Sequence, residues 1–240
     1  MPGEMESRIR VAGLTVALYH THDYLRRLCR DYLVPPTAAP DLTVSLDPGE
    51  IEAEAARPGG LRGTPGQVES LCLCRKLADL LPTYGVLLFH AAAVRVGERG
   101  FAFAGPSGIG KSTHAGLWAE YFGATFVNGD KPLLICRENE VLVCGSPWAG
   151  KEGRQQNVTV PLGGLCFVRR AKENRIRRLP AEEAAARLLS QSLTPREADA
   201  AGSWLTLLDR VARLVPLWEI ECDISRRAAE LSYRTMTGSP

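Results

Sequence analysis

Apolar and polar residues alternate near the start of the chain, and further along the apolar positions take helical spacing. Alternation over residues 8–18 predicts a strand, and the stripe of apolar side chains over 68–81 predicts a helix. Residues 47–67 are rich in proline, glycine and charge, which predicts a loop. A further helix and strand are expected at 22–33 and 41–46. Residues 1–84 are therefore expected to form a small N-terminal α+β region.

The pattern changes after Gly85, where apolar runs follow one another with short turns between them. A continuous run over 86–96, a turn and a strand at 101–104 predict an antiparallel hairpin, and 133–135 with 141–143 predict a second. The remaining expected elements are strands at 124–127, 158–169 (its run 165–168 pairing with 175–179) and 216–222, and helices at 180–192, from Thr194 to about 214, and at 225–236. We expect an α/β domain over 85–240 with a mixed sheet that contains antiparallel hairpins.

The stretch from Gly105 to Ser112 fits the pattern G-x-x-x-x-G-K-[ST], with a predicted strand before it and a predicted helix after it. Glycines let successive backbone N–H groups converge on one anion, and a helix N-terminus adds about half a positive charge. Lys111 is expected to reach the β- and γ-phosphates, and Ser112 to ligate Mg²⁺. The residues expected to contact the phosphates are Gly105, Ser107, Gly108, Ile109, Gly110, Lys111, Ser112 and Thr113.

Asp130 follows a predicted strand in the sequence Asn128-Gly129-Asp130, where the glycine allows a ligand to approach closely. We expect its carboxylate to hold Mg²⁺, directly or through water, and to accept the substrate proton. The alternative is an aspartate that only shapes a turn. His90 lies in an apolar run, where a single histidine is more often a core residue than a functional one.

The glycine-rich loop 145–157 brings Lys151, Glu152 and Arg154 together after Trp148. The two cations could neutralise transition-state charge or clamp a substrate, and the alternative is a solvated loop. Trp148 could stack on a substrate or anchor the loop. A basic cluster lies further along the chain and consists of Arg169, Arg170, Lys172, Arg175, Arg177 and Arg178. It could bind an acidic peptide or phosphate groups, or it could be a solvated hairpin. The cluster has no interleaved aromatic residues, which disfavours nucleic acid as its ligand.

The overall composition and net charge of the chain are typical of a water-soluble protein. The 240 residues are 45% hydrophobic and carry a net charge of +2, so no overall field favours nucleic acid or membrane. No apolar run approaches the roughly 18 residues of a membrane span, and residues 1–10 are too polar for a signal peptide, so a cytoplasmic location is expected. The seven cysteines are expected to be reduced and buried, although Cys136 and Cys144 could face each other across their hairpin.

Three features together resemble the HPr kinase/phosphorylase family, which shares its P-loop fold with ATP-dependent phosphoenolpyruvate carboxykinase. They are His90 on the hairpin before the motif, the motif itself, and Asn128-Gly129-Asp130. The resemblance covers about residues 85–150. It implies ATP and Mg²⁺ as cofactors, with His90 near the γ-phosphate as a polar contact or proton carrier.

The same resemblance also shows two departures. Family members usually have two adjacent aspartates that help bind Mg²⁺ and activate the attacking hydroxyl; the second matches Asp130, whereas the first falls on Gly129. The family's glutamate-arginine-glycine signature strand is not found, and 145–157 is a different loop. HPr itself is therefore not the expected substrate.

Three functions follow from these observations. The first is an ATP-dependent kinase that phosphorylates a hydroxyl, on Ser or Thr of a protein or peptide or on a small-molecule alcohol. The second is a catalytically silent nucleotide-binding module of a peptide-modification system, which the glycine at position 129 favours. The third, an ordinary ATPase or GTPase switch, is disfavoured by the antiparallel hairpins. A protein or peptide partner is expected, without nucleic acid or membrane, and a homo-oligomer is left open.

Overall fold

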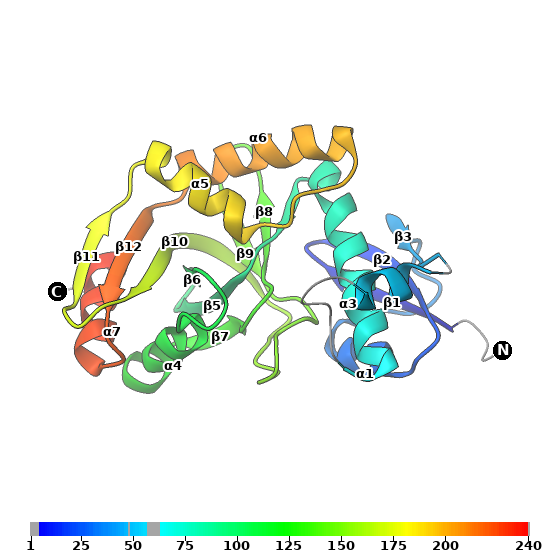
Figure 1. Cartoon of the computed structure of the whole chain (residues 1–240), viewed down its shortest axis with the longest axis horizontal. Coiled ribbons are helices and arrows are strands. Elements are labelled where there is room, and N and C mark those ends of the chain that lie inside the picture. The colour runs from blue at the N-terminus through cyan, green and yellow to red at the C-terminus, as the bar shows by residue number, and fades with distance from the viewer. Residues whose placement is uncertain (1–4, 48, 57–62, 240) are drawn as a thin grey trace.

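The structure is a computed structural model that describes residues 5–47, 49–56 and 63–239. Two sheets organise the chain, one with three strands and one with nine. Figure 1 shows the N-terminal elements lying beside the larger sheet, with α5 and α6 over one face of that sheet and α4 and α7 over the other. Among the described helices, none is long and apolar enough to cross a bilayer.

The small sheet lies in the order β1-β2-β3, with β1 antiparallel and β3 parallel to β2. Its strands are β1 (Met5–Val11), β2 (Leu14–His20) and β3 (Leu42–Val44). The helical segments of this region are α1 (Tyr24–Leu28), η1 (Arg30–Tyr32), α2 (Glu50–Ala55), α3 (Pro65–Leu80) and η2 (Leu81–Tyr84). The single helix expected at 22–33 is instead the two short segments α1 and η1.

The helix α3 has a clear local cause and a firm attachment. Thr64 and Gln67 form a capping box and Pro65 occupies the first turn, which is how many helices begin. The buried carboxylate of Glu69 accepts hydrogen bonds from the backbone N–H groups of Thr21 (2.7 Å) and His22 (3.0 Å). Because those residues connect β2 to α1, this carboxylate fixes α3 against both elements.

The large sheet is built around one long strand, β10 (Thr159–Arg170). Its first residues pair antiparallel with β9, and its later residues lie between β6 and β12, both parallel to it. The other pairings of the sheet are antiparallel. Its other strands are β4 (Val86–Leu88), β5 (Ala91–Val96), β6 (Arg99–Ala104), β7 (Thr125–Asn128), β8 (Leu133–Cys136), β9 (Val141–Cys144), β11 (Arg175–Arg178) and β12 (Leu217–Cys222).

The expected mixed sheet and both expected hairpins, β5–β6 and β8–β9, are present. Three details of the expectation were wrong. The apolar run 86–96 is two strands, because β4 pairs with β8 whereas β5 pairs with β6 and β7. Strand β11 pairs with β12 rather than β10, since β12 lies between them. Cys136 and Cys144 do not face each other, because their partners are Val141 and Leu133; the seven cysteines are buried thiols.

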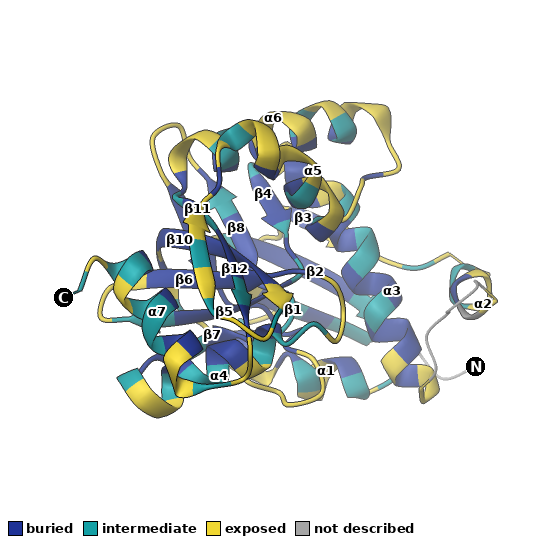
Figure 2. Ribbon diagram, turned by 60° about the vertical axis from the view of Figure 1, so that its left-hand side comes forward, coloured by how far each residue is buried: buried dark blue, intermediate teal, exposed yellow. Residues whose placement is uncertain are grey.

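Four helices cover the large sheet: α4 (Lys111–Phe122), α5 (Ala181–Gln191), α6 (Ala198–Leu214) and α7 (Arg226–Thr237). Alternate residues of β5 serve the two faces: Ala91 and Ala93 pack in the core under α5 and α6, and Ala92 and Val94 in the core over α4 and α7. Figure 2 shows most strands of the large sheet buried, with β11 mainly exposed, and the outer helix faces exposed. The helix expected from Thr194 begins only at Ala198.

A third core joins the small sheet to the edge of the large one. It contains Leu73 and Leu77 of α3 together with Val86, Leu133 and Trp148 from the larger sheet and its following loop. Burying a large apolar side chain is worth about 1.5–3 kcal/mol. The boundary expected at residue 84 is therefore crossed by continuous packing, which holds the N-terminal elements beside the loops at the end of the large sheet.

Candidate functional site

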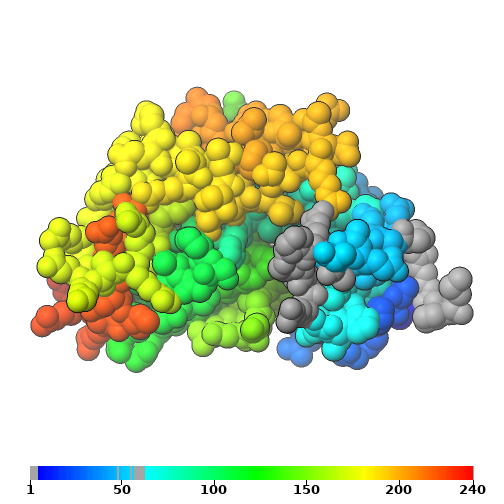
Figure 3. Space-filling model, in the orientation of Figure 1, coloured from blue at the N-terminus to red at the C-terminus, as the bar shows by residue number. Residues whose placement is uncertain are grey.

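The glycine-rich loop connects β6 to α4, so the predicted strand, loop and helix start are present. Gly105, Gly108 and Gly110 have φ angles of 144°, 76° and 118°, a region that favours glycine. No side chain caps the N-terminus of α4 at Gly110. The first N–H groups of a helix have no partner inside it, so those of α4 are available to an anion. Figure 3 shows the green loop bordering a hollow in the surface.

Lys111 is the first residue of α4 and is only 6% exposed. Its Nζ donates hydrogen bonds to the carbonyl oxygens of Gly105 (2.9 Å) and Pro106 (3.2 Å). Burial lowers the pKa of this ammonium, and the charge of Asp130 partly offsets that effect. The Lys111 side chain thus folds back along the glycine-rich loop, and its ammonium group lies against the loop backbone.

Ser112 and Asn128 connect the helix start to the turn that carries Asp130. Ser112 Oγ donates to the carbonyl of Gly129 at 3.1 Å. The Oδ1 atom of buried Asn128 accepts from the N–H groups of Asp130 (2.9 Å) and Lys131 (2.7 Å). This side chain therefore shapes the turn, which is a role that Asn favours, and sets the direction in which Asp130 leaves it.

The carboxylate of Asp130 lies between two basic side chains. His90 Nε2 is 3.3 Å from Oδ1, and Lys131 Nζ forms a short ion pair with Oδ2. Burial raises the pKa of Asp130, but the hydrogen bond from His90 and the charge and hydrogen bond of Lys131 outweigh it, so the net pKa is well below its ordinary value. His90 reaches this position because it lies in the break between β4 and β5.

Two residues that the sequence did not mark hold the loop from outside. Gln191, at the end of α5, accepts from the N–H of Gly105 through Oε1 at 3.1 Å. Its own carbonyl accepts from the N–H of His90 at 2.7 Å. Arg170, at the end of β10, donates to the carbonyls of Ile109 (3.1 Å) and Gly108 (2.5 Å). No local signal identifies Gln191, whereas Arg170 belonged to the basic cluster.

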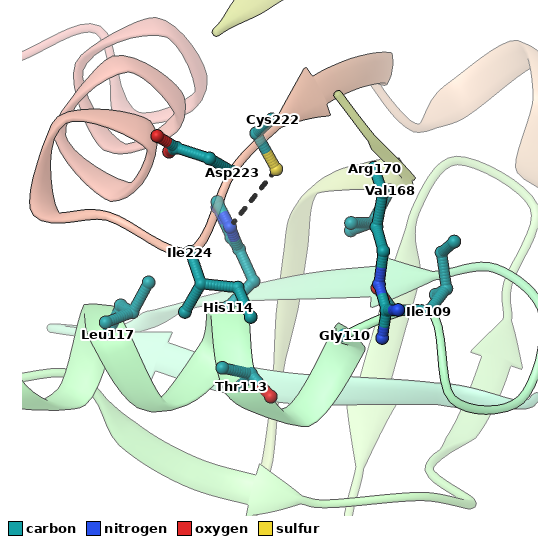
Figure 4. Close-up of a pocket in the computed structure, with 10 residues that line it drawn as sticks. All are labelled: Ile109, Gly110, Thr113, His114, Leu117, Val168, Arg170, Cys222, Asp223 and Ile224. Carbon is teal, nitrogen blue, oxygen red and sulfur yellow. Dashed lines mark hydrogen bonds between the residues drawn. The ribbon is translucent and has the colours of Figure 1, made fainter. Parts of the chain in front are cut away.

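A shallow groove runs along the outer side of the loop and the start of α4. Figure 4 shows Ile109 and Arg170 on one side of it and Leu117 and Ile224 on the other, with Thr113 at the helix start. Ile224 is 67% exposed, which is unusual for a large apolar side chain. The volume of the groove is only about 20 Å³, so it offers little more than the space of one water molecule beside the free end of α4.

His114 and Cys222 also line this groove but do not form a catalytic pair. Ser232 Oγ donates to the carbonyl of Ala229, so His114 Nε2 donates to Ser232 Oγ and its Nδ1 lacks a proton. Burial lowers the pKa of His114 to about 4 and raises the pKa of the Cys222 thiol to about 11. Both groups are neutral near pH 7, and the thiol is not a nucleophile.

The loop after β9 pairs two of its three predicted substrate residues and leaves the third apart from them. Arg154 pairs with Glu152 at 3.0 Å and lies over the ring of Phe126, with its guanidinium carbon 4.9 Å from the centroid. Lys151 has no hydrogen-bond or ion-pair partner among the described residues and lines a pocket beside Asp130. Trp148 is buried and donates to Ser70 Oγ at 3.1 Å, so it anchors the loop to α3.

Most of the basic cluster is engaged within the protein. Glu219 pairs with Arg169, Arg177 and Arg187, and Glu173 pairs with Arg175. Arg178 lies over the ring of Trp218. Within the described part of the chain, Lys172 alone of the cluster has no partner. The cluster thus offers little free positive charge to an acidic ligand.

The oxygen donors beside the loop suit magnesium, which prefers hard oxygen ligands and keeps several waters. The carboxylate of Asp130 and the hydroxyl of Ser112 flank the same turn, because Ser112 bonds to Gly129. Among the described residues, no group of three His, Cys, Asp or Glu side chains forms a metal cage. A site of one carboxylate, one hydroxyl and ligand phosphates needs no such cage.

Comparison with known proteins gives little beyond this geometry. No family model and no curated protein matches the chain. Among solved structures, the HPr(Ser) kinase/phosphatase from Coxiella burnetii matches with a TM-score of 0.38 and 13% identity, over 63% of this chain and 88% of that chain. This is a distant structural relationship only.

Proposed function

We propose that this protein is a magnesium-dependent phosphotransferase that moves the γ-phosphoryl group of ATP to an alcohol. The observation that carries the proposal is the buried amine of Lys111 at the uncapped start of α4, with the carboxylate of Asp130 close enough to affect its pKa. Free N–H groups and a buried cation on one side, and a carboxylate on the other, are the parts that phosphoryl transfer requires.

Each group has a defined task. The N–H groups of the loop and of the first turn of α4 bind the phosphate oxygens, and Lys111 exchanges its two carbonyl partners for β- and γ-phosphate oxygens. Ser112 and Asp130 would hold magnesium, which when bound neutralises phosphate charge.

The reaction forms one bond and breaks one. The acceptor oxygen bonds to the γ-phosphorus, the bond from that phosphorus to the β–γ bridging oxygen breaks, and ADP leaves. The hydroxyl proton goes to the carboxylate of Asp130 and then to His90, whose Nε2 is 3.3 Å away, or to solvent. A loose transition state demands alignment and charge neutralisation more than a strong base, which suits a carboxylate of low pKa.

The test compares Lys111→Ala with Lys172→Ala, which removes a lysine that has no partner among the described residues. Calorimetry with Mg·ATP and transfer of label from γ-³²P-ATP to candidate acceptors are measured for both variants. Lys111→Ala should lose transfer by a factor of about 10³ or more, with an unchanged circular dichroism spectrum, and Lys172→Ala should match the wild type. Equal transfer by the two variants would refute the proposal.

The alternative is the nucleotide-binding module without transfer, and Gly129 is the residue that favours it. A Cβ atom at Gly129 would lie 3.0 Å from the carbonyl oxygen of Ala149, so the space for a second carboxylate is taken by backbone. Binding of Mg·ATP without a labelled acceptor in a broad peptide and metabolite screen would support this alternative over the kinase.

A further inference from the structure

A second pocket is lined by Asp130 and by no residue of the glycine-rich loop. Its volume is about 270 Å³, close to the lower limit of roughly 300 Å³ for small-ligand sites. Two parts of the chain line it: Tyr24, Leu28, Gln67, Ser70 and Leu71 from α1 and α3, and Asp130, Lys131, Trp148, Ala149, Gly150 and Lys151 from the end of the large sheet. Asp130 and Lys131 line this pocket and also influence the pKa of Lys111.

The two walls of the pocket are fixed to each other. Trp148 Nε1 donates to the carbonyl and to the hydroxyl of Ser70, both at 3.1 Å, which joins the loop after β9 to α3. The carboxylate of Glu69 binds the N–H groups that precede α1, which holds α1 to the same helix. The pocket is therefore a preformed part of the fold, and the N-terminal region supplies one side of it.

The lining groups define a specific chemistry. Tyr24, Leu28 and Leu71 present partly buried apolar surface along one wall. Lys131 is engaged by Asp130, whereas Lys151 at the rim is exposed and has no partner among the described residues. A ligand with an apolar group for the wall and an anionic group for Lys151 would place a hydroxyl between them, next to the carboxylate of Asp130.

We propose that this pocket is the phosphoryl-acceptor site, and that it takes an alcohol carrying both an apolar group and an anionic group. A serine or threonine side chain of a peptide with an apolar and an acidic neighbour has this chemistry, and so has a free acylated hydroxy amino acid. The inference rests on the proposed phosphotransfer, since Asp130 would then lie beside both the acceptor hydroxyl and the γ-phosphate. The N-terminal region thereby sets acceptor specificity.

The test uses the full-length protein and two kinds of probe. One is a set of octapeptides with a central serine, a neighbouring leucine and a glutamate, with a matched set in which lysine replaces glutamate. The other is N-benzoylserine. Transfer of ³²P from ATP gives kcat and KM, and fluorescence anisotropy of labelled peptide without nucleotide gives binding alone. The variants are Lys151→Glu and Leu28→Glu, with Lys172→Glu as the charge-matched control.

The expected result is that glutamate peptides or N-benzoylserine accept phosphate, and whichever does so identifies the source of the acceptor. Lys151→Glu should raise KM for them by about tenfold with little change in kcat, and the control should behave as the wild type. Wild-type KM in both pocket variants, or equal use of lysine peptides, overturns the inference. Mg·ATP binding with no acceptor among the probes also overturns it.

Failure of nucleotide binding, on which the proposed function depends, gives a different result. In that case no heat is seen with Mg·ATP, while the anisotropy measurement still reports whether the peptides occupy the pocket. Loss of peptide binding in Lys151→Glu and Leu28→Glu, but not in Lys172→Glu, would then support the pocket as a binding site without transfer. Equal anisotropy in the three variants would reject the pocket itself.

Discussion

Replacing Gln191 by leucine tests whether the glycine-rich loop is held from outside. Gln191 is 7% exposed, and its Oε1 is the acceptor for the buried N–H of Gly105, at 3.1 Å. Leucine keeps the apolar bulk of the side chain and its helical preference at the end of α5. It removes the acceptor, so the first amide of the loop loses its partner in a place that water reaches poorly.

The size of the effect follows from this contact. A buried donor left without a partner costs about 1–3 kcal/mol. The bond from Gln191 Nε2 to Ser190 Oγ, 3.1 Å long, is also lost, but Ser190 is exposed and an exposed bond adds at most about 0.5 kcal/mol. For a chain of this size 1 kcal/mol shifts Tm by about 2–4 °C, so a loss of about 2 kcal/mol, the middle of this range, should lower the Tm of Gln191→Leu by about 4–8 °C.

The matched control is Ser190→Ala, which removes only the second of these bonds. Urea denaturation gives the free energy of unfolding of each variant, and calorimetry gives its affinity for Mg·ATP. We expect Gln191→Leu to be less stable by about 2 kcal/mol and to bind nucleotide more weakly, because the loop entrance is no longer fixed. If the two variants are equally stable and bind Mg·ATP equally, the loop is not held through Gln191.

Two further predictions concern His114 and Gly129. The folded-state pKa of His114 is lowered to about 4, so the unfolded chain binds more protons at mildly acidic pH. The contribution of His114 to the free energy of unfolding is therefore complete above about pH 6.5 and is lost as the pH falls toward 4. The free energy of unfolding should fall by about 2 kcal/mol between about pH 7 and pH 5. Urea denaturation of His114→Gln should lack this slope, and an unchanged slope would contradict the burial argument. Gly129→Asp, which introduces a second carboxylate next to Asp130, should destabilise the fold by about 1–3 kcal/mol and leave transfer no faster, because its Cβ atom would lie 3.0 Å from the carbonyl oxygen of Ala149. Gly129→Ala measures the loss of stability caused by the added Cβ atom alone. Faster transfer by Gly129→Asp would show that the loop containing Ala149 moves to make room for the side chain.

The parts of the fold that depend on residues close together in the sequence were predictable from it. Both hairpins join strands through short turns, so alternation and turn residues identify them. The strand β12 comes from residues far from β10 and β11 yet lies between them, and no local pattern carries that information. The signals at Thr194 to Glu197 predicted a helix start, but Ser192 bridges to Phe89 and Arg196 reaches Asp79 at 3.7 Å, so this segment stays extended.

The candidate site likewise has a part that the sequence predicted and a part that it did not. The motif located the loop, its lysine and its serine, because their chemistry requires a fixed spacing along the chain. Gln191 and the N-terminal wall of the pocket beside Asp130 lie far from the motif in sequence and reach it only through tertiary packing. The break at His90 was also hidden, since both β4 and β5 are buried and their residues look alike.

The charge around Asp130 bears on which role this carboxylate can have. With His90 and Lys131 against its two oxygens, it stays ionised far below neutral pH, and an acid of such low pKa binds a proton weakly. In the proposed transfer this carboxylate would hold the hydroxyl proton only briefly before passing it on. Its main contribution would be its fixed charge and direction, set by Asn128 through two N–H bonds. That role does not need a second aspartate to raise its pKa, and this is why glycine at position 129 is compatible with phosphoryl transfer.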